Sequence, residues 1–316
     1  MDVRDSQSGS SGPGQRAEGR DLLWIALFLA PFLFFYVAFT LWPLSATVYY
    51  SFFEWDGVKP LENFVGLGNY KQIVMDPVFW LAFRNTLLFA LGNTVIKLPL
   101  TLFVAILLTR RWLWLKTFFR TVFFSPIIIP VAMAGLVFVL LLNPANGAVN
   151  DILKSLGLIH KPIDFLGKPR LAMLSLILVS VWQIFGQYMV YWMAALQNVP
   201  EELYEAAEID GANEWHKLIH ITLPIIRPVA IIILFLAFVN ALRVFGLVVT
   251  MTSGGPGQST YVVSYFIYNQ AFQEFPFRYG YASAAAVLFA VIVLTAISIQ
   301  GYMVSRAQAE QRMYEM

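Results

Sequence analysis

The sequence predicts an all-α integral membrane protein with six transmembrane helices, and two observations support this fold class. Hydrophobic residues make up 59% of the 316-residue chain and charged residues 13%, whereas soluble domains are roughly half apolar and about a quarter charged. The apolar residues also gather in runs that are long enough to cross a bilayer as helices. A chain with so little charge cannot cover itself with a soluble surface, so we expect lipid around it.

The chain begins with a polar segment, residues 1–21, that is rich in Gly, Ser and Pro. This composition predicts a disordered tail. The first apolar run follows at residues 22–43 and is longer than a signal-peptide core of roughly 7 to 15 residues. It ends at Trp42 and Pro43, where an interfacial aromatic residue stands instead of a cleavage site. We therefore predict a retained first span.

Five further apolar runs are long enough to span the bilayer, which gives a six-helix domain over residues 22–303. Pro99 in the second run, and Pro126 and Pro130 in the third, predict interruptions of those helices. A short polar tail, residues 304–316, ends the chain. The five spans are expected at residues 79–108, 118–142, 171–194, 225–250 and 280–303.

The distribution of Lys and Arg predicts how the chain is oriented in the membrane. Residues 110–116, RRWLWLK, form a short basic connection, and short loops weigh most in the positive-inside rule. With this connection in the cytoplasm, both termini and residues 195–224 also face the cytoplasm. The long loops rich in Gly and Pro then face outward; they comprise residues 44–78, 143–170 and 251–278.

Several kinds of chemistry are absent from the sequence. The chain has no cysteine, and its net charge of +2 is too small to indicate a nucleic acid partner. The glycine-rich segment 254–260 lacks the lysine of a phosphate-binding loop. His216 and His220 have metal-ligand spacing but no third ligand nearby. We therefore expect no metal, no cofactor and no catalytic residues in this chain, and any ATP must bind to another subunit.

The densest cluster of acids lies in residues 201–224, between two apolar runs. Pro200 and the acids after it predict a helix start. Gly211 predicts a bend, because glycine adopts positive φ without strain, and a second short helix follows. Apolar residues recur at helical spacing along the segment, which favours a docking element over a solvated loop. These apolar residues are Leu203, Ile209, Trp215, Leu218 and Ile219.

One spaced pattern in this segment resembles a known family. Glu205-Ala206-Ala207, followed by Gly211 and then by Ile221-x-Leu223-Pro224, is similar to the EAA motif of permease subunits of binding-protein-dependent ABC importers. Other pieces resemble the sugar-transporting branch of that family and occur in its order. They are GLGNY at 66–70, FRNT at 83–86, FFRTVFFSP at 118–126, AALQNVPEELYEAAEIDGAN at 194–213 and TSGGPGQST at 252–260.

The resemblance implies a type I ABC importer permease fold in a bacterial or archaeal cytoplasmic membrane. It also implies the partners: a second permease subunit, two ATP-binding subunits and an extracytoplasmic solute-binding protein that delivers a mono- or oligosaccharide. The EAA loop, residues 195–224, would dock on the ATPase. Glu205 would pair with a basic residue there, Ala206 and Ala207 would allow close packing, and Gly211 would form the bend between Asp210 and Ala212.

Polar residues inside the predicted spans are candidates for the solute pathway, because a charge in lipid costs roughly 3 kcal/mol or more. Arg243 and Asn240 belong to the fifth span. Amide and phenol groups of the fourth span suit hydroxyl-rich solutes; they are Gln183, Gln187, Tyr188 and Tyr191. The alternative role for all of them is hydrogen bonding between helices. Lys97 is expected to satisfy carbonyls that the adjacent Pro99 frees.

Two other functions remain compatible with parts of the sequence. Arg243 would also suit a glycerol-phosphate-like polyol ester as the solute. A stand-alone secondary transporter would explain the six spans, but it would leave residues 201–224 without a role. An intramembrane enzyme is not supported, because no set of acid, nucleophile or metal ligands stands out. Many members of the resembled family have an acid after the residue that corresponds to Phe245, where this chain has Gly246.

Overall fold

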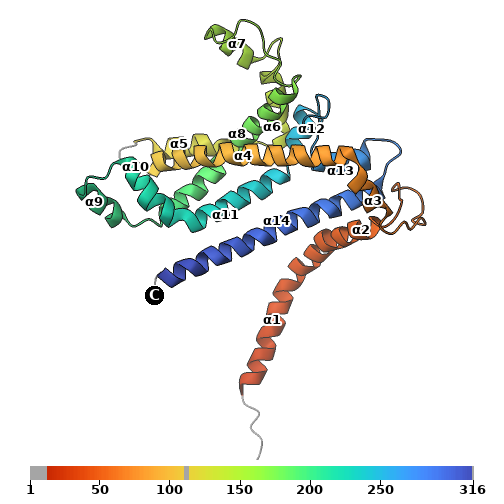
Figure 1. Cartoon of the computed structure of the whole chain (residues 1–316). Helices are drawn as coiled ribbons and strands as arrows, with labels where there is room; N and C mark the ends of the chain where they lie inside the picture. The colour runs from red at the N-terminus through yellow and green to blue at the C-terminus, as the bar shows by residue number, and fades with distance from the viewer. Residues whose placement is uncertain (1–12, 110–113, 315–316) are drawn as a thin grey trace, which may run out of the picture.

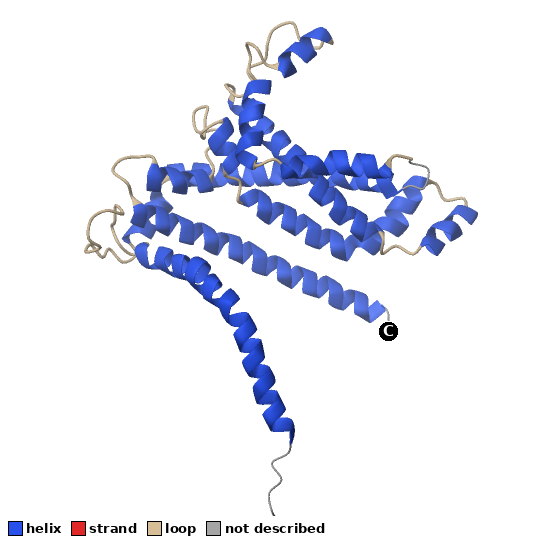
Figure 2. Ribbon diagram, turned by 180° about the vertical axis from the view of Figure 1, so that it is seen from behind, coloured by secondary structure: helices blue, strands red, loops and turns tan. Residues whose placement is uncertain are grey.

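The computed structural model describes residues 13–109 and 114–314, and in this part of the chain nearly all regular structure is helical (Figures 1 and 2). Five helical segments are long and apolar enough to cross a membrane. A sixth span results if the bent pair of helices in residues 116–141 is counted as one. The predicted fold class is confirmed.

The first span leaves the rest of the molecule. Helix α1 (Pro13–Tyr36), the π-helical turn η1 (Val37–Leu41) and α2 (Trp42–Tyr50) follow one another directly, and α1 points away from the other helices (Figure 1). None of the most apolar part of this span is buried within the chain. Because α1 begins at Pro13, the later part of the segment expected as a disordered tail is helical; residues 1–12 lie outside the described residues.

The centre of the molecule is built on two long helices, α4 (Pro77–Thr109) and α8 (Pro169–Leu196). Helix α11 (Leu223–Leu242) packs against both, and α14 (Tyr279–Tyr314) lies beside α11 (Figure 1). The prediction that Pro99 interrupts the second span is wrong, because α4 continues through it. Membrane helices tolerate such a proline when neighbouring helices cover the freed backbone, and α8 covers α4 here.

The third span is broken as its prolines predict. Helix α5 (Lys116–Phe124) leads through a 3-10 turn, η2 (Ser125–Ile128), to α6 (Val131–Leu141). The two halves meet at 100°. A Cβ atom at Gly186 of α8 would overlap the backbone of Phe124, so glycine at this position lets the end of α5 approach α8 closely.

The fifth span ends earlier along the chain than predicted, and the helical segment that contains it begins earlier, at Glu214. Helix α11 ends at Leu242, where Arg243 leaves helical geometry with φ −92° and ψ 15°. A separate short helix, α12 (Gly246–Met251), then packs against α6. A Cβ atom at Gly246 would overlap the side chain of Val131. Glycine at this position therefore lets the start of α12 approach the start of α6 closely.

Short helices and loops occupy the ends of the long helices. One end holds α3 (Gly68–Met75) and α13 (Val263–Phe272), while α7 (Ala148–Ser155) stands on the loop before α8. The opposite end of α4 and α8 holds α9 (Glu201–Ile209), α10 (Glu214–Lys217) and the π-helical turn η3 (Leu218–Thr222) (Figure 1). Figure 2 shows from behind that these two groups of short helices lie at opposite ends of the long helices.

Buried asparagines tie the loops at the α3 end to the helices. Asn69 donates its Nδ2 to the carbonyl oxygens of Ser51 at 2.9 Å and Phe53 at 2.8 Å. Asn85 donates to those of Gln258 at 2.9 Å and Tyr261 at 3.1 Å. Asn69 and Asn85 belong to the GLGNY and FRNT segments, so these two sequence motifs hold loop backbone against the membrane helices.

Candidate coupling loop, pathway cluster and outer pocket

The EAA segment forms a bent pair of short helices, α9 and α10, at one end of the bundle (Figure 1). Helix α9 starts directly after Pro200, and α10 is capped by Asn213, whose Oδ1 accepts the backbone N–H of His216 at 2.9 Å. Between them Gly211 has a φ of +79°. The predicted helix, bend and second helix are all present, and the positive φ explains the glycine.

Lys217 holds the two short helices together. Its Nζ donates to Glu208 Oε1 of α9 at 2.6 Å and to Glu214 Oε1 of α10 at 3.1 Å. Only 8% of the lysine side chain is exposed. Two of the acids in this segment therefore have a partner within the loop itself. Sequence reasoning missed this bridge, although Glu214 and Lys217 have the i, i+3 spacing of a helical ion pair.

A second link joins α9 to the start of α11. The hydroxyl groups of Tyr204 and Thr222 are 2.8 Å apart, and Thr222 also donates to the backbone carbonyl of Lys217 at 3.2 Å. Thr222 is buried and directly precedes α11. Tyr204 thus ties α9 to the residue directly before α11, while Lys217 ties α9 to α10, which belongs to the same continuous helical segment as α11, Glu214–Leu242.

The predicted coupling residues lie on the outside of this loop. Glu205, Ala206, Asp210 and Gly211 are exposed, and Ala207 and Ala212 are partly buried. Large apolar side chains are also exposed here, above all Ile209 by 88% and Trp215 by 68%. Exposed apolar groups next to acids are typical of a protein-docking surface. His216 and His220 stack with 5.6 Å between ring centroids, and no group of three possible metal ligands occurs among the described residues.

Four of the six predicted pathway residues lie together, and we call them the pathway cluster: Gln187, Tyr188, Tyr191 and Asn240. Gln187 donates its Nε2 to the Tyr191 hydroxyl at 2.7 Å. The rings of Tyr188 and Tyr191 are 5.6 Å apart. Asn240, from α11, is exposed and within hydrogen-bonding reach of the Tyr188 hydroxyl. The cluster therefore joins α8 to α11.

The other two predicted pathway residues have different surroundings. Gln183 is buried and donates to the carbonyl oxygen of Ile129 at 3.1 Å, in the bend between η2 and α6. Gln183 thus supplies a hydrogen bond to a backbone carbonyl that the break in the third span frees. This is hydrogen bonding between helices, the alternative role that the sequence analysis left open. Arg243 is exposed at the end of α11.

Lys97 does not behave as the sequence suggests. Its Nζ reaches no carbonyl near Pro99 and has no hydrogen-bond partner in the described residues. Instead it lies 4.0 Å from the centroid of the Tyr188 ring. The sequence shows only that Lys97 is a lone lysine within an apolar run. The fold is needed to show that this lysine faces α8.

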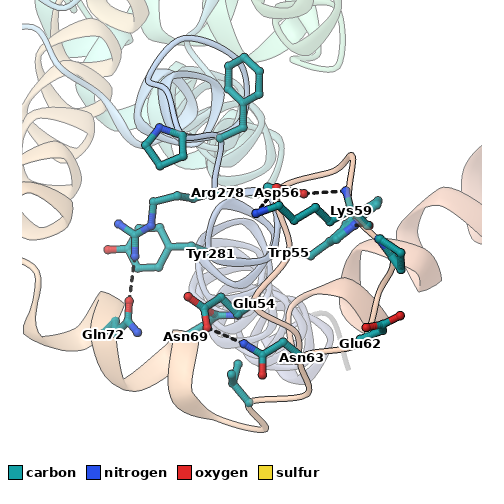
Figure 3. A pocket seen from close by; sticks show the side chains of 14 residues that line it. Glu54, Trp55, Asp56, Lys59, Glu62, Asn63, Asn69, Gln72, Arg278 and Tyr281 are labelled. Atoms are coloured by element: carbon teal, nitrogen blue, oxygen red, sulfur yellow. Dashed lines mark hydrogen bonds and ion pairs between the residues drawn. The ribbon is translucent and has the colours of Figure 1, made fainter.

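A pocket of about 610 Å³ with many polar side chains (Figure 3) lies beside α3, at the opposite end of the molecule from α9 (Figure 1). We call it the outer pocket. It lies between the loop after α2, helix α3 and the start of α14. Its lining includes Glu54, Trp55, Asp56, Glu62, Asn63, Gln72 and Arg278. The sequence indicated only turns here, because residues from distant segments build the pocket.

Hydrogen bonds fix several walls of the outer pocket (Figure 3). Arg278 donates its Nη2 to Gln72 Oε1 at 2.8 Å, and Asn63 donates to Glu54 Oε2 at 2.8 Å. The backbone N–H groups of Lys59 and Val58 donate to Asp56, and these bonds hold the pKa of that carboxyl below its usual range. The pocket is therefore a structured surface with groups of both charges.

A family model described as "Binding-protein-dependent transport system inner membrane component" matches residues 97–308. The chain belongs to this family. It is therefore an inner membrane component of a transport system that depends on a solute-binding protein. A stand-alone secondary transporter no longer accounts for it. Both the coupling loop and the pathway cluster lie within the matched residues of this family member.

Individual relatives agree with the family match. The chain is 36% identical over 272 residues to a probable ABC transporter permease protein, YurN, of Bacillus subtilis, covering 85% of this chain and 91% of that one. It is 31% identical over 273 residues to the lactose transport system permease protein LacF of Rhizobium radiobacter, covering 86% and 90%.

Solved structures share the fold of this permease-family member. A chain in the crystal structure of a bacterial ABC transporter involved in the import of the acidic polysaccharide alginate superposes with a TM-score of 0.80 at 24% identity, covering 93% of this chain and 99% of that chain. A second structure, of the alginate transporter with an alginate pentasaccharide-bound periplasmic protein, gives a TM-score of 0.79 at 23% identity, covering 92% of this chain and 97% of that chain.

Proposed function

We propose that this chain is the transmembrane permease subunit of an ATP-driven importer that moves a mono- or oligosaccharide across the cytoplasmic membrane. The observation that supports it most is the coupling loop: a bent helix pair with exposed Ile209 and Trp215, held together by Lys217 and tied by Tyr204 to Thr222, directly before α11. A rigid knob of this kind suits the transmission of motion from a cytoplasmic ATPase.

The partners follow from this arrangement. Two ATP-binding subunits hydrolyse ATP, and this chain holds no cofactor of its own. Glu205, which forms no ion pair within the described residues, contacts a basic residue of the ATPase, and Ala206 lets the two backbones approach. A second permease subunit completes the pathway. The coupling loop and both termini then lie in the cytoplasm.

Two observations support a carbohydrate as the solute: the relatives of this chain and the side chains of the pathway cluster. The lactose permease relative is 31% identical over most of both chains. Gln187, Tyr191 and Asn240 offer amide and hydroxyl groups, which pair with sugar hydroxyls without requiring a charge. A glycerol-phosphate-like ester is the second candidate, because Arg243 is exposed at the same end of α11 as Asn240.

The outer pocket belongs to the face on which the solute-binding protein docks. It lies at the end of the molecule opposite to the coupling loop (Figure 1), so it is extracytoplasmic when that loop is cytoplasmic. Polar groups of both charges line it, and a complementary polar surface on a partner would be steered toward it.

Copurification tests the function. The chain is expressed with the subunits encoded beside it, purified in nanodiscs and assayed for ATPase activity with the binding protein and lactose, maltotriose or glycerol 3-phosphate. We expect two ATP-binding subunits and a second permease to copurify, and a saccharide to stimulate hydrolysis. Stimulation by glycerol 3-phosphate alone would replace the sugar assignment with the ester.

The variant Glu205→Lys is the matched test of the coupling loop. Charge reversal should release the ATPase and abolish uptake while the chain still inserts in the membrane. Glu202→Lys, at an exposed acid in the first turn of the same helix, is the control and should keep both. Unchanged copurification in the Glu205 variant would contradict the assigned docking surface, and a wild-type chain that binds no ATPase would contradict the function.

A further inference from the structure

Lys97 is completely buried in the second span. Within the described residues its Nζ has no hydrogen-bond acceptor. Its near neighbour is the aromatic face of Tyr188, 4.0 Å from Nζ to the ring centroid. A cation at this distance is attracted by the ring quadrupole. The amine of α4 is thus directed at one side chain of α8.

Tyr188 connects this buried amine to the other residues of the pathway cluster. Tyr188 as a whole, its hydroxyl included, is only 1% exposed, and that hydroxyl lies close to the side chain of the exposed Asn240 on α11. The neighbouring Tyr191 packs edge-on against it. Lys97 therefore contacts the face of a ring whose hydroxyl takes part in the cluster.

The position of Lys97 is costly for stability. An amine buried without an acceptor loses its hydration and gains no hydrogen bond in return. Replacing such a buried group by an apolar one of similar volume is often neutral or stabilising. Ionisable residues inside membrane spans for this reason usually indicate a function. Packing of α4 on α8 would be served equally well by methionine.

We propose that Lys97 is a positioning residue for solute recognition: it fixes the Tyr188 ring so that the buried Tyr188 hydroxyl holds the exposed Asn240 amide toward a hydroxyl-rich solute. The proposal rests on the function proposed above, because it takes the pathway cluster as the place where the solute passes. Lys97 itself does not touch the solute.

The test compares Lys97→Met, Lys97→Arg and Thr101→Val in the whole importer in nanodiscs. Thr101 is the matched control, because it is buried one turn further along α4 and donates only to carbonyls of its own helix, those of Lys97 and Leu98. Tyr188 is replaced by 3-fluorotyrosine in each background, and its fluorine resonance reports the ring environment without any solute.

We expect Lys97→Met to leave the unfolding temperature unchanged or to raise it, and to shift and broaden the fluorine resonance. For the saccharide that stimulates the wild-type ATPase, KM for uptake should rise about tenfold with little change in maximal rate, because binding and not turnover is affected. Lys97→Arg keeps a cation over the ring and should restore the resonance and KM. Thr101→Val should match wild type.

Two outcomes would overturn the proposal. An unchanged fluorine resonance in Lys97→Met would show that the lysine does not position the ring. A lower unfolding temperature with a parallel loss of maximal uptake would show a purely structural role. The fluorine and stability measurements need no solute, so they decide this proposal even if no saccharide proves to be transported.

Discussion

Gly211 shows how one backbone angle shapes the coupling loop. Its φ of +79° lies in the left-handed region, and no atom lies within 4 Å of the place where a Cβ would be. Space is therefore available for a side chain, and only the backbone conformation selects glycine. A non-glycine residue in this region costs about 1 to 2 kcal/mol, but less for asparagine.

Gly211→Val should therefore impair coupling, whereas Gly211→Asn should retain most of it. The β-branched valine resists positive φ and would change the angle between α9 and α10. We expect uptake per ATP hydrolysed to fall several-fold in the valine variant. Reconstituted importer with parallel uptake and ATPase assays measures this ratio. Equal losses in both variants would mean that side-chain bulk at a partner surface, not φ, is the cause.

At the scale of elements, the Lys217 bridge keeps α9 and α10 in one arrangement. Removing the amine in Lys217→Met leaves Glu208 and Glu214 without their shared partner. The two helices should then move independently, so ATP hydrolysis should continue with less transport per ATP. Lys217→Arg preserves the charge and should restore most of the ratio. A Lys217→Met importer with the wild-type ratio would show that the bridge is not needed for coupling.

The loop at residues 252–262 offers a prediction about stability. Asn85→Ala removes both hydrogen bonds to this loop and leaves the carbonyl groups of Gln258 and Tyr261 without that donor. An unsatisfied buried group costs about 1 to 3 kcal/mol, so thermal unfolding of the purified chain should occur several degrees lower. Asn198→Ala, at an exposed position, is the control and should leave the temperature unchanged.

The sequence predicted elements well where the cause is local. The helix start after Pro200, the turn at Gly211 and the break at Pro126 and Pro130 all follow from backbone rules and appear in the structure. The continuity of α4 through Pro99 depends on its cover by α8. The early end of α11 likewise depends on α12 packing against α6. Neither neighbour is visible in a linear pattern.

The candidate sites were predictable to different degrees for the same reason. The predicted coupling residues lie within one short segment, 205–212, so a motif could point to them. Gln183 and Tyr188 are one and a half turns apart on α8, yet one contacts the bend at Ile129 and the other faces Lys97. Residue type alone does not separate these two roles. The outer pocket brings together residues from both ends of the chain.

At the scale of the whole molecule, the outer pocket and the coupling loop lie at opposite ends of the long helices (Figure 1). The chain has no cysteine, so one introduced thiol can be labelled selectively. Glu62→Cys, on the exposed rim of the pocket, should cross-link to the solute-binding protein through a maleimide photoprobe. Glu202→Cys, on α9, should cross-link to the ATPase instead.

The cross-linking pattern also tests the orientation. Exchanged products, with the ATPase at position 62, would invert the predicted topology. Absence of a product at position 62 while the binding protein still stimulates hydrolysis would show that docking occurs elsewhere on that face. A soluble binding protein added in excess without the probe should compete the product away.

The unburied first span has a consequence for the life of the protein in the cell. Helix α1 and the residues after it bury none of their most apolar stretch against their own chain. In the proposed assembly, the bilayer and the neighbouring subunits cover this stretch. A copy synthesised without those neighbours would keep a separate, unassembled helix that membrane proteases can extract. The amount of this subunit should therefore follow the supply of its partners more closely than its own rate of synthesis.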